Sequence, residues 1–274
     1  FRSALYLDLD GTAVDDSGQL RTATIQAVHN FKAHGGQVGI ATGRALTQAQ
    51  EVIRTLEPTL PVVLFNGSAI WDVERQKLLT VSHLDEGTLS RFCSLARDDA
   101  RIRGAVFHYP VKSVPDRDSL AFSAIAQEMH LAPDYRIQLT QLSADSLLKI
   151  LVVARNADLD SLNLKFDKAL TNATVVASTP TTLEIIPKSV SKFQTISHIL
   201  KERGLSPTRL VAIGDGRNDL EMVKGAGLGV AMSNGDPRVR EAADPIKAAN
   251  STDPHYKFLH FRIKSGHTIR PCVS

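Results

Sequence analysis

The sequence predicts an α/β fold: a mostly parallel sheet core with a second α/β domain inserted into the chain. Short apolar runs alternate with helical patterns along the 274 residues, as in successive βα units. Polar motifs lie towards both ends of the chain, and residues 83–182 carry none of them although they show strand and helix patterns of their own. We therefore expect a core made of residues 1–82 and 183–274, with an inserted domain over residues 83–182.

Each element is predicted from the spacing of its apolar residues. The strands predicted from short apolar runs are residues 4–9, 37–41, 62–65, 148–154, 183–186, 209–213 and 229–232. The helices predicted from helical spacing are residues 22–33, 46–56, 86–97, 119–130, 159–170, 191–203 and 219–225. In the helix at 191–203, Ser191 can cap the start and Gly204 follows the end.

Composition argues against several classes of protein. The net charge is only +3, no block of like charge occurs and aromatic residues make up 5%, so nucleic-acid binding has no support. The longest apolar runs, such as residues 150–154, are too short to span a bilayer, and we expect no membrane partner. Cys93 and Cys272 lack metal-ligand spacing and are expected as reduced thiols. A polar motif that begins at residue 8 leaves no room for a secretory signal, so we expect a cytoplasmic protein.

The first polar motif is Asp-Leu-Asp-Gly-Thr at residues 8–12, directly after a predicted strand. Side chains two apart on a regular strand point to the same side, so we expect Asp8 and Asp10 to lie together. Two such carboxylates repel unless a cation lies between them or one is protonated, and the pair suits Mg²⁺. One carboxylate could attack phosphorus, while the other exchanges a proton with the leaving oxygen and then with water.

A calcium loop and a plain turn are two other interpretations of this motif. A calcium loop that starts at Asp8 needs an Asp or Asn where Thr12 stands and a Glu where Gln19 stands, so it is excluded. A plain turn rich in Asp and Gly stays open at this point, and Gly11 lets the chain turn sharply in either case.

Two weaker motifs could bind phosphate. The Thr42 hydroxyl and the Gly43 amide follow a predicted strand, and such a strand-to-helix junction can hold a phosphate oxygen. Taken alone, Thr-Gly is also a common capping and turn pair. Lys192, at the start of the helix at 191–203, could neutralise a phosphate and an attacking carboxylate together, although a lone Lys there is usually solvated.

The fourth motif is Gly-Asp-Gly-Arg-Asn-Asp at residues 214–219, after another predicted strand. Asp215 and Asp219 lie four apart at the start of a helix and could supply further oxygen ligands. N-capping explains either acid but not both together with two glycines between strand and helix. Because open α/β sheets bind ligands at the carboxyl ends of their strands, we expect the four motifs to meet there.

Taken together and in this order, the four segments resemble the four motifs of the haloacid dehalogenase (HAD) superfamily, whose core sheet is Rossmann-like. The resemblance covers the core at both ends of the chain. It implies a Mg²⁺-dependent phosphatase that hydrolyses small phosphate monoesters of a phosphorylated metabolite through an aspartyl-phosphate. Asp8 is then the nucleophile and a metal ligand, and Asp10 is the general acid and base, with its backbone carbonyl on the metal.

The same resemblance implies roles for the remaining motif residues. Asp215 is the third protein ligand of the metal, and Asp219 ligates it through water or holds its neighbours. Asn218 orients the phosphate or Lys192. Thr42, the Gly43 amide and Lys192 bind the transferring phosphoryl group.

The insert is similar to the class II, subtype B cap of this superfamily. Residues 65–69 and 229–235 also resemble the Cof-type subfamily, whose members dephosphorylate sugar phosphates and cofactor phosphates. Two departures stand out: Phe193 occupies a position that is usually Gly, and the stretch from about Asp253 lacks the usual ending. Candidate cap contacts to substrate, each expected on the solvated surface, are Arg101, Arg103, His108, Lys112 and Arg117.

Other functions stay open at this stage. A phosphomutase with the same cap would pass the phosphoryl group to a sugar instead of water. A non-enzymatic phospho-acceptor switch also uses Asp, Mg²⁺ and Lys, but the second acid, Asp10, argues against it. A degenerate binding protein would be expected to lose Asp8 or Asp215, and the sequence keeps both.

Overall fold

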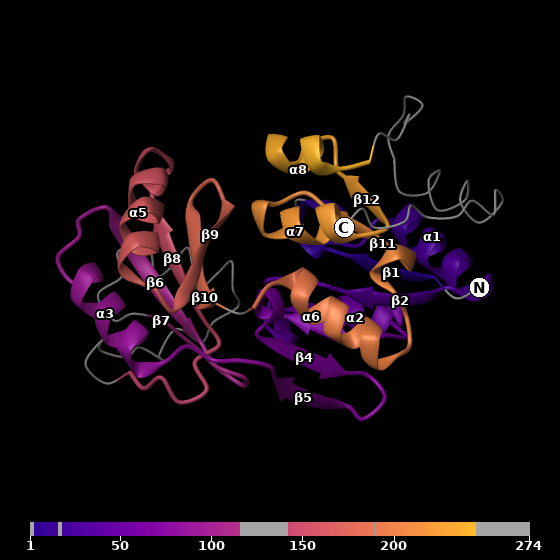
Figure 1. Ribbon diagram of the computed structural model, residues 1–274, viewed down its shortest axis with the longest axis horizontal. Coiled ribbons are helices and arrows are strands. Elements are labelled where there is room, and N and C mark those ends of the chain that lie inside the picture. The colour runs from indigo at the N-terminus through magenta and orange to yellow at the C-terminus, as the bar shows by residue number, and fades with distance from the viewer. Residues whose placement is uncertain (1–2, 16–17, 116–141, 189, 245–274) are drawn as a thin grey trace.

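The computed structural model describes residues 3–15, 18–115, 142–188 and 190–244. Its elements form two lobes, one built on a parallel sheet and the other on an antiparallel sheet (Figure 1). In the first lobe, four parallel strands are ordered β12-β11-β1-β2. They are β1 (Ala4–Leu7), β2 (Gln37–Ile40), β11 (Leu210–Gly214) and β12 (Leu228–Ala231).

Helices cover both faces of the parallel sheet, which explains why its strands are apolar without alternation. Alternate residues of β1 divide between two clusters: Leu5 and Leu7 pack with residues of α1 and α2, whereas Ala4 and Tyr6 pack with residues of α6 and α7. The helices are α1 (Thr22–Ala33), α2 (Leu46–Leu56), α6 (Lys192–Glu202), α7 (Leu220–Gly225) and α8 (Pro237–Ala242).

A small antiparallel sheet extends the core beyond β2. It contains β3 (Val62–Leu64), β4 (Ala69–Asp72) and β5 (Lys77–Thr80), in that order. A parallel bridge between Ala41 and Val63 joins β3 to the end of β2. The 3-10 turn Phe65–Gly67 follows β3, and Phe65 and Asn66 have φ angles of 49° and 56°, in the left-handed region. This turn therefore lies beside the loop that leaves β2.

The second lobe holds a five-stranded sheet of order β7-β6-β8-β10-β9, with antiparallel neighbours throughout. Its strands are β6 (Ile102–His108), β7 (Ser113–Pro115), β8 (Lys149–Ala154), β9 (Ala173–Thr179) and β10 (Thr182–Pro187). One face packs on α3 (Glu86–Ala96) and α5 (Asn156–Ala169), where the Phe92 ring lies 5.9 Å from Phe107 and 5.4 Å from Phe166 between centroids. The other face carries His108, Lys149 and Glu184.

The predicted fold class is confirmed: the chain is mixed α/β with a parallel sheet and a second α/β lobe. Every predicted strand overlaps an observed one, whereas β4, β5, β6, β7 and β9 were not predicted. The boundary predicted between residues 182 and 183 falls within β10, whose pairing with β8 and β9 puts the whole strand in the five-stranded sheet. The predicted helix at 119–130 lies outside the described residues, as does the stretch from Asp253. No helix in the described ranges has the length and apolar character needed to cross a membrane.

Candidate active site

The sequence motifs meet where the parallel strands end. Asp8 directly follows β1, residues 41–43 follow β2, and Asp215 follows β11. Because β1 lies between β2 and β11 in the sheet, these three loops are neighbours at its carboxyl edge. Lys192 is the first residue of α6, a helix on one face of the sheet, and its side chain contacts Asp8 at this edge.

The turn after β1 brings two acidic loops into contact. The Asp8 amide still donates to the Ile213 carbonyl at 2.9 Å, but the chain then turns through Leu9–Ala13, with Gly11 at a φ of 72°. A Cβ added at Gly11 would lie 2.3 Å from Oδ2 of Asp215. Only glycine combines this backbone conformation with the close approach of the Asp215 carboxylate.

The strand ends at Leu7 and the pleat does not continue through the turn, so Asp8 and Asp10 lie in different surroundings. The Asp8 side chain is buried, whereas the Asp10 side chain is 62% exposed. Arg44 holds the Asp10 carboxylate through two nitrogens: Nη2 donates to Oδ1 at 2.6 Å and Nε donates to Oδ2 at 3.0 Å.

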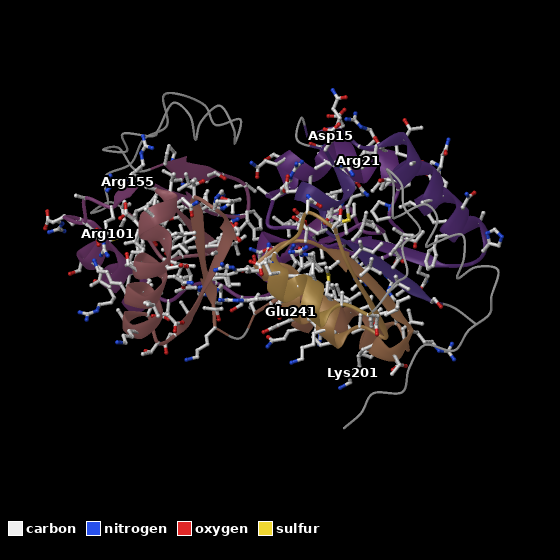
Figure 2. All side chains as sticks on the ribbon, turned by 90° about the horizontal axis from the view of Figure 1, so that it is seen from above. Asp15, Arg21, Arg101, Arg155, Lys201 and Glu241 are labelled. Atoms are coloured by element: carbon white, nitrogen blue, oxygen red, sulfur yellow. The ribbon has the colours of Figure 1, made fainter. Side chains whose placement is uncertain are left out.

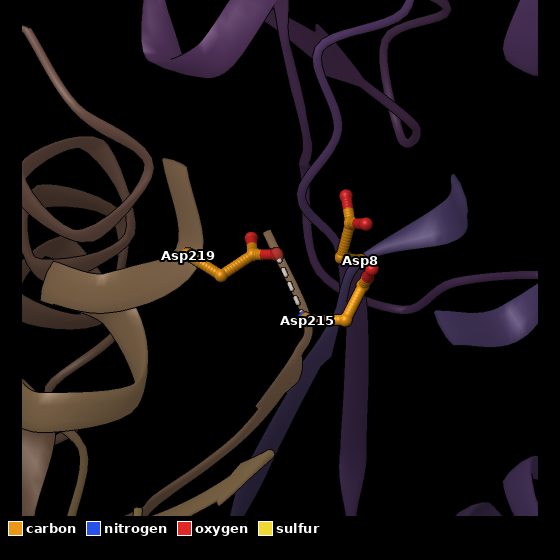
Figure 3. A group of neighbouring side chains, drawn as sticks. All are labelled: Asp8, Asp215 and Asp219. Atoms are coloured by element: carbon orange, nitrogen blue, oxygen red, sulfur yellow. Dashed lines mark hydrogen bonds between the residues drawn. The ribbon is translucent and has the colours of Figure 1, made fainter. Parts of the chain in front are cut away.

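Three carboxylates form the centre of the site (Figure 3). One oxygen from each of Asp8, Asp215 and Asp219 lies within 4.8 Å of the others. Burial raises the pKa of the Asp8 carboxyl well above its usual range, and the negative charge of Asp219 raises it further. Burial also raises the pKa of Asp215, against the hydrogen bond that Thr12 donates to its Oδ1 at 2.7 Å. The cluster therefore holds more negative charge than its surroundings neutralise, and its hard oxygen donors suit a divalent cation.

Lys192 is the cation of this site, and its side chain is 0% exposed. Its Nζ donates to Oδ1 of Asp8 at 2.6 Å and to Oδ1 of Asp219 at 2.7 Å. Burial alone would lower the pKa of Lys192, but the charges of Asp219 and Asp8 outweigh burial and raise it. Lys192 is therefore charged at neutral pH. In isolation, the sequence favoured a solvated Lys; the two acids explain why it is buried instead.

Asp219 has both oxygens occupied. While Oδ1 accepts from Lys192, Oδ2 accepts from the backbone amides of Asp215 at 3.1 Å and Gly216 at 3.0 Å. The bond to the Asp215 amide is the dashed line in Figure 3. These contacts suit a residue that orients Lys192 and the Asp215 loop.

The loop after β2 presents an amide and a hydroxyl. The Thr42 amide donates to the Val63 carbonyl at 2.9 Å, and Thr42 Oγ1 accepts from the Arg44 amide at 3.1 Å. Among the described residues, the Gly43 amide has no hydrogen-bond acceptor. An unpaired amide beside the end of a parallel strand is available to an anion.

Sequence reasoning missed three buried polar residues next to this loop: Asn66, Lys149 and Glu184. Asn218 donates from Nδ2 to Oδ1 of Asn66 at 3.0 Å, so the fourth motif is connected to them. A signal was present, because Lys149 begins an otherwise apolar strand and Glu184 lies inside a mostly apolar one.

The unusual Phe193 turns away from the acidic centre. A Cβ added at Gly225 of α7 would lie 2.2 Å from the Phe193 ring, so the ring packs on that glycine. The large side chain is thus accommodated between α6 and α7.

The candidate cap contacts differ in their surroundings. Arg101 donates to both oxygens of Asp99, at 2.8 and 2.6 Å, and Figure 2 places it at the outer end of its lobe. Arg103 and Lys112 are exposed as expected, and Arg117 lies outside the described residues.

The expectation of a solvated side chain is wrong for His108, since His108 is 1% exposed and burial lowers its pKa well below the usual range. It is buried because it lies opposite Lys149 on the inward face of the sheet, with its ring 5.9 Å from that of Phe65.

Several known proteins with similar sequences are named phosphatases. A putative phosphatase of Streptococcus pyogenes serotype M6 is 28% identical over 89% of this chain and 92% of its own length. The 5-amino-6-(5-phospho-D-ribitylamino)uracil phosphatase of Bacillus subtilis is 27% identical over 91% of each chain. Among solved structures, a HAD subclass IIB sugar phosphatase superposes with a TM-score of 0.76 at 20% identity, covering 88% of this chain and 92% of its own, which shows a shared fold.

The model of the haloacid dehalogenase-like hydrolase family matches residues 5–259, so the chain belongs to this family. Within it, the chain is a phosphoric monoester hydrolase that acts on small phosphorylated substrates.

Proposed function

We propose that this chain is a Mg²⁺-dependent phosphatase that hydrolyses sugar phosphates or cofactor phosphates through an aspartyl-phosphate on Asp8. One observation carries the proposal: Lys192 holds one oxygen of the buried Asp8 carboxylate, beside Asp215 and at the sheet edge that also carries the unpaired Gly43 amide. The names of a ribitylamino-uracil phosphatase and a sugar phosphatase among similar proteins support this substrate class.

The residues present fit a magnesium ion. Asp8 and Asp215 offer carboxylate oxygens, and the backbone carbonyl of Asp10 is assigned as a further ligand. The close approach that Gly11 permits and the raised pKa values of Asp8 and Asp215 indicate a site that gains from added positive charge. Bound there, Mg²⁺ would neutralise charge on the phosphoryl oxygens.

In the first step, Asp8 attacks phosphorus. Its Oδ1 is bound to Lys192, and its Oδ2 accepts no hydrogen bond from the described residues, so Oδ2 is the attacking oxygen. A bond forms between Oδ2 and phosphorus while the bond from phosphorus to the ester oxygen breaks. Lys192, the Thr42 hydroxyl and the Gly43 amide hold the phosphoryl oxygens during this transfer.

Asp10 supplies the proton that the leaving oxygen needs. It must first leave Arg44, because a carboxylate paired with a guanidinium on two sides has no proton to donate. In the second step, Asp10 takes a proton from water, whose oxygen attacks phosphorus and releases Asp8 and inorganic phosphate. Asn218 orients the loop at residues 41–43, called the phosphate loop, through its hydrogen bond to Asn66, and Asp219 orients Lys192.

We also propose that the five-stranded sheet with α3 and α5 is an inserted cap that excludes water from the site during transfer. Because the whole of β10 belongs to this sheet, we place the end of the cap at about residue 187 instead of residue 182.

The test is phosphate release from a panel of sugar, nucleotide and vitamin phosphates, with and without Mg²⁺. We expect turnover of one substrate class, complete loss in excess chelator, and recovery when Mg²⁺ is restored. Sugar bisphosphates are included with each sugar phosphate, because phosphoryl transfer to sugar without phosphate release would indicate a mutase. Full turnover in excess chelator would contradict the metal assignment.

A further inference from the structure

A buried ion pair lies between the five-stranded sheet and the core. Lys149 of β8 and Glu184 of β10 are 2.7 Å apart, and their side chains are only 4% and 6% exposed. Glu184 pairs with Leu151 in the sheet, so Lys149 lies two residues along β8 and on the same face as Glu184. That face is opposite the one packed on α3 and α5, and it meets the loops of the active site.

Both charged side chains reach across to the core. Lys149 Nζ donates to the Gly43 carbonyl at 2.7 Å as well as to Glu184. The second oxygen of Glu184 accepts from Nδ2 of Asn66, whose Oδ1 accepts from Asn218 at 3.0 Å. One chain of hydrogen bonds therefore runs from the Gly43 loop, through the ion pair, to the loop that carries Asp215 and Asp219.

This network clamps the peptide that joins Gly43 to Arg44 at both ends. Lys149 holds its carbonyl, and Thr42 Oγ1 accepts from its N–H at 3.1 Å. A Cβ at Gly43 would lie 3.3 Å from both the Asn66 Oδ1 and the Glu184 Oε1, so the two side chains pack against the glycine itself. Because glycine has wide backbone freedom, fixing this peptide plane also restricts where the preceding Gly43 amide points.

Stability alone does not explain the pair. Removing two charges from water costs several kcal/mol per ion, and apolar side chains of similar volume often do as well or better. What the charged pair adds is direction, since its hydrogen bonds hold particular atoms at particular angles.

We infer that Lys149 and Glu184 are positioning residues that aim the Gly43 amide at the phosphoryl group. This inference rests on the proposed function, in which that amide binds phosphate. Both side chains come from the five-stranded sheet. The affinity of the site for inorganic phosphate, which has no leaving group, therefore depends on that lobe.

The decisive variant is Lys149→Met/Glu184→Gln. Met removes the donor to Gly43, while Gln leaves no unpaired charge and still offers an oxygen to Asn66. The matched control is Lys165→Met, because Lys165 also donates to a backbone carbonyl (Leu95, 2.9 Å) and a carboxylate (Asp99, 2.6 Å) but lies away from the core. Thermal melts identify any variant that is not folded.

With saturating Mg²⁺, kcat and KM are measured on p-nitrophenyl phosphate, together with the inhibition constant of inorganic phosphate. We expect the double variant to raise KM and the phosphate inhibition constant together by about 10- to 100-fold, with kcat changed less. The control should change neither constant. In ¹⁵N-glycine-labelled protein, the Gly43 amide resonance should shift with phosphate in the wild type and need correspondingly more phosphate in the double variant.

An unchanged phosphate inhibition constant in the folded double variant overturns the inference. A rise in KM alone also overturns it, since Lys149 would then contact the leaving group instead of orienting the phosphate loop. Failure of the proposed function is a different result, because the wild type would then release no phosphate from any substrate.

Discussion

Two acidic sites, one in each lobe, show opposite electrostatics. In the antiparallel lobe, Asp99 accepts hydrogen bonds from Arg101 and Lys165, which hold its pKa well below the usual range. In the parallel lobe, burial and mutual repulsion raise the pKa values of Asp8 and Asp215. The residue type is the same, and the difference among the described residues is the number of cations paired with the acids: two for one acid at Asp99, and one buried Lys192 for the three-acid cluster. A carboxylate that is fully paired serves the fold, whereas an under-neutralised cluster is left able to bind a cation and substrate.

The contributions of the two sites to the stability of the fold depend on pH in opposite directions. The depressed pKa of Asp99 contributes stability above the unfolded value of about 3.9, and this is lost as pH falls through the folded pKa. The raised pKa values of Asp8 and Asp215 mean that the folded state binds protons more tightly than the unfolded state. Without metal, their contribution therefore becomes unfavourable as pH rises from about 4 through the folded pKa values.

The largest expected effect comes from Asp8→Asn. Removing the proposed nucleophile should lower kcat by at least about 10⁴-fold and abolish phosphoenzyme labelling by a reactive phosphate donor. Unfolding in urea at pH 7.5 without Mg²⁺ should be no easier than for the wild type, because one repulsive charge is gone and Lys192 keeps Asp219. A marked loss of stability would contradict the difference between the two sites, since Asp8 would then stabilise the fold as Asp99 does.

Asp10→Asn is expected to have the next largest effect. The variant keeps the proposed nucleophile and the backbone carbonyl but loses the proposed proton donor, so turnover should fall by about 10²- to 10⁴-fold. The fall should be smaller for p-nitrophenyl phosphate, whose leaving group departs with little protonation. Phosphoenzyme should accumulate, because the base that activates water is lost as well. If Asp8→Asn still labels at this site while Asp10→Asn does not, the two roles are reversed.

The smallest effect is expected from Asp99→Asn, and it concerns stability alone. Loss of the bonds to Arg101 and Lys165 should lower the free energy of unfolding by about 1–2 kcal/mol at pH 7, with kcat and KM unchanged. The difference from wild type should be full above about pH 5 and shrink progressively below about pH 4, as Asp99 is protonated in the wild type. Urea denaturation at a series of pH values measures it. A difference that grows at low pH would contradict the assigned sign.

The site could be predicted from sequence where its residues are close along the chain or follow a strand. Asp8, Thr42 and Asp215 each directly follow a short apolar run or lie within two residues of one, and parallel strands bring their carboxyl ends to one edge. The sequence did not predict how Asp10 is held, because period-2 alternation holds only while the strand continues, this strand ends at Leu7, and Arg44 binds the Asp10 carboxylate from another loop. His108 was misplaced for a related reason: the unpredicted strand β6 turns it inward, opposite Lys149.

Local sequence thus determined the α/β alternation, the strand-end motifs and the capped helix that carries Lys192, because each depends on residues within a few positions of one another. Tertiary structure alone decided which groups are paired. Arg44 meets Asp10 across 34 positions, Lys149 meets Gly43 across 106, and Asn66 meets Glu184 across 118. The membership of β10 in the second sheet is of the same kind. Such contacts leave no periodic trace in the chain, because they depend on how two sheets and their loops are packed together, and that packing sets the burial and charge of each acid.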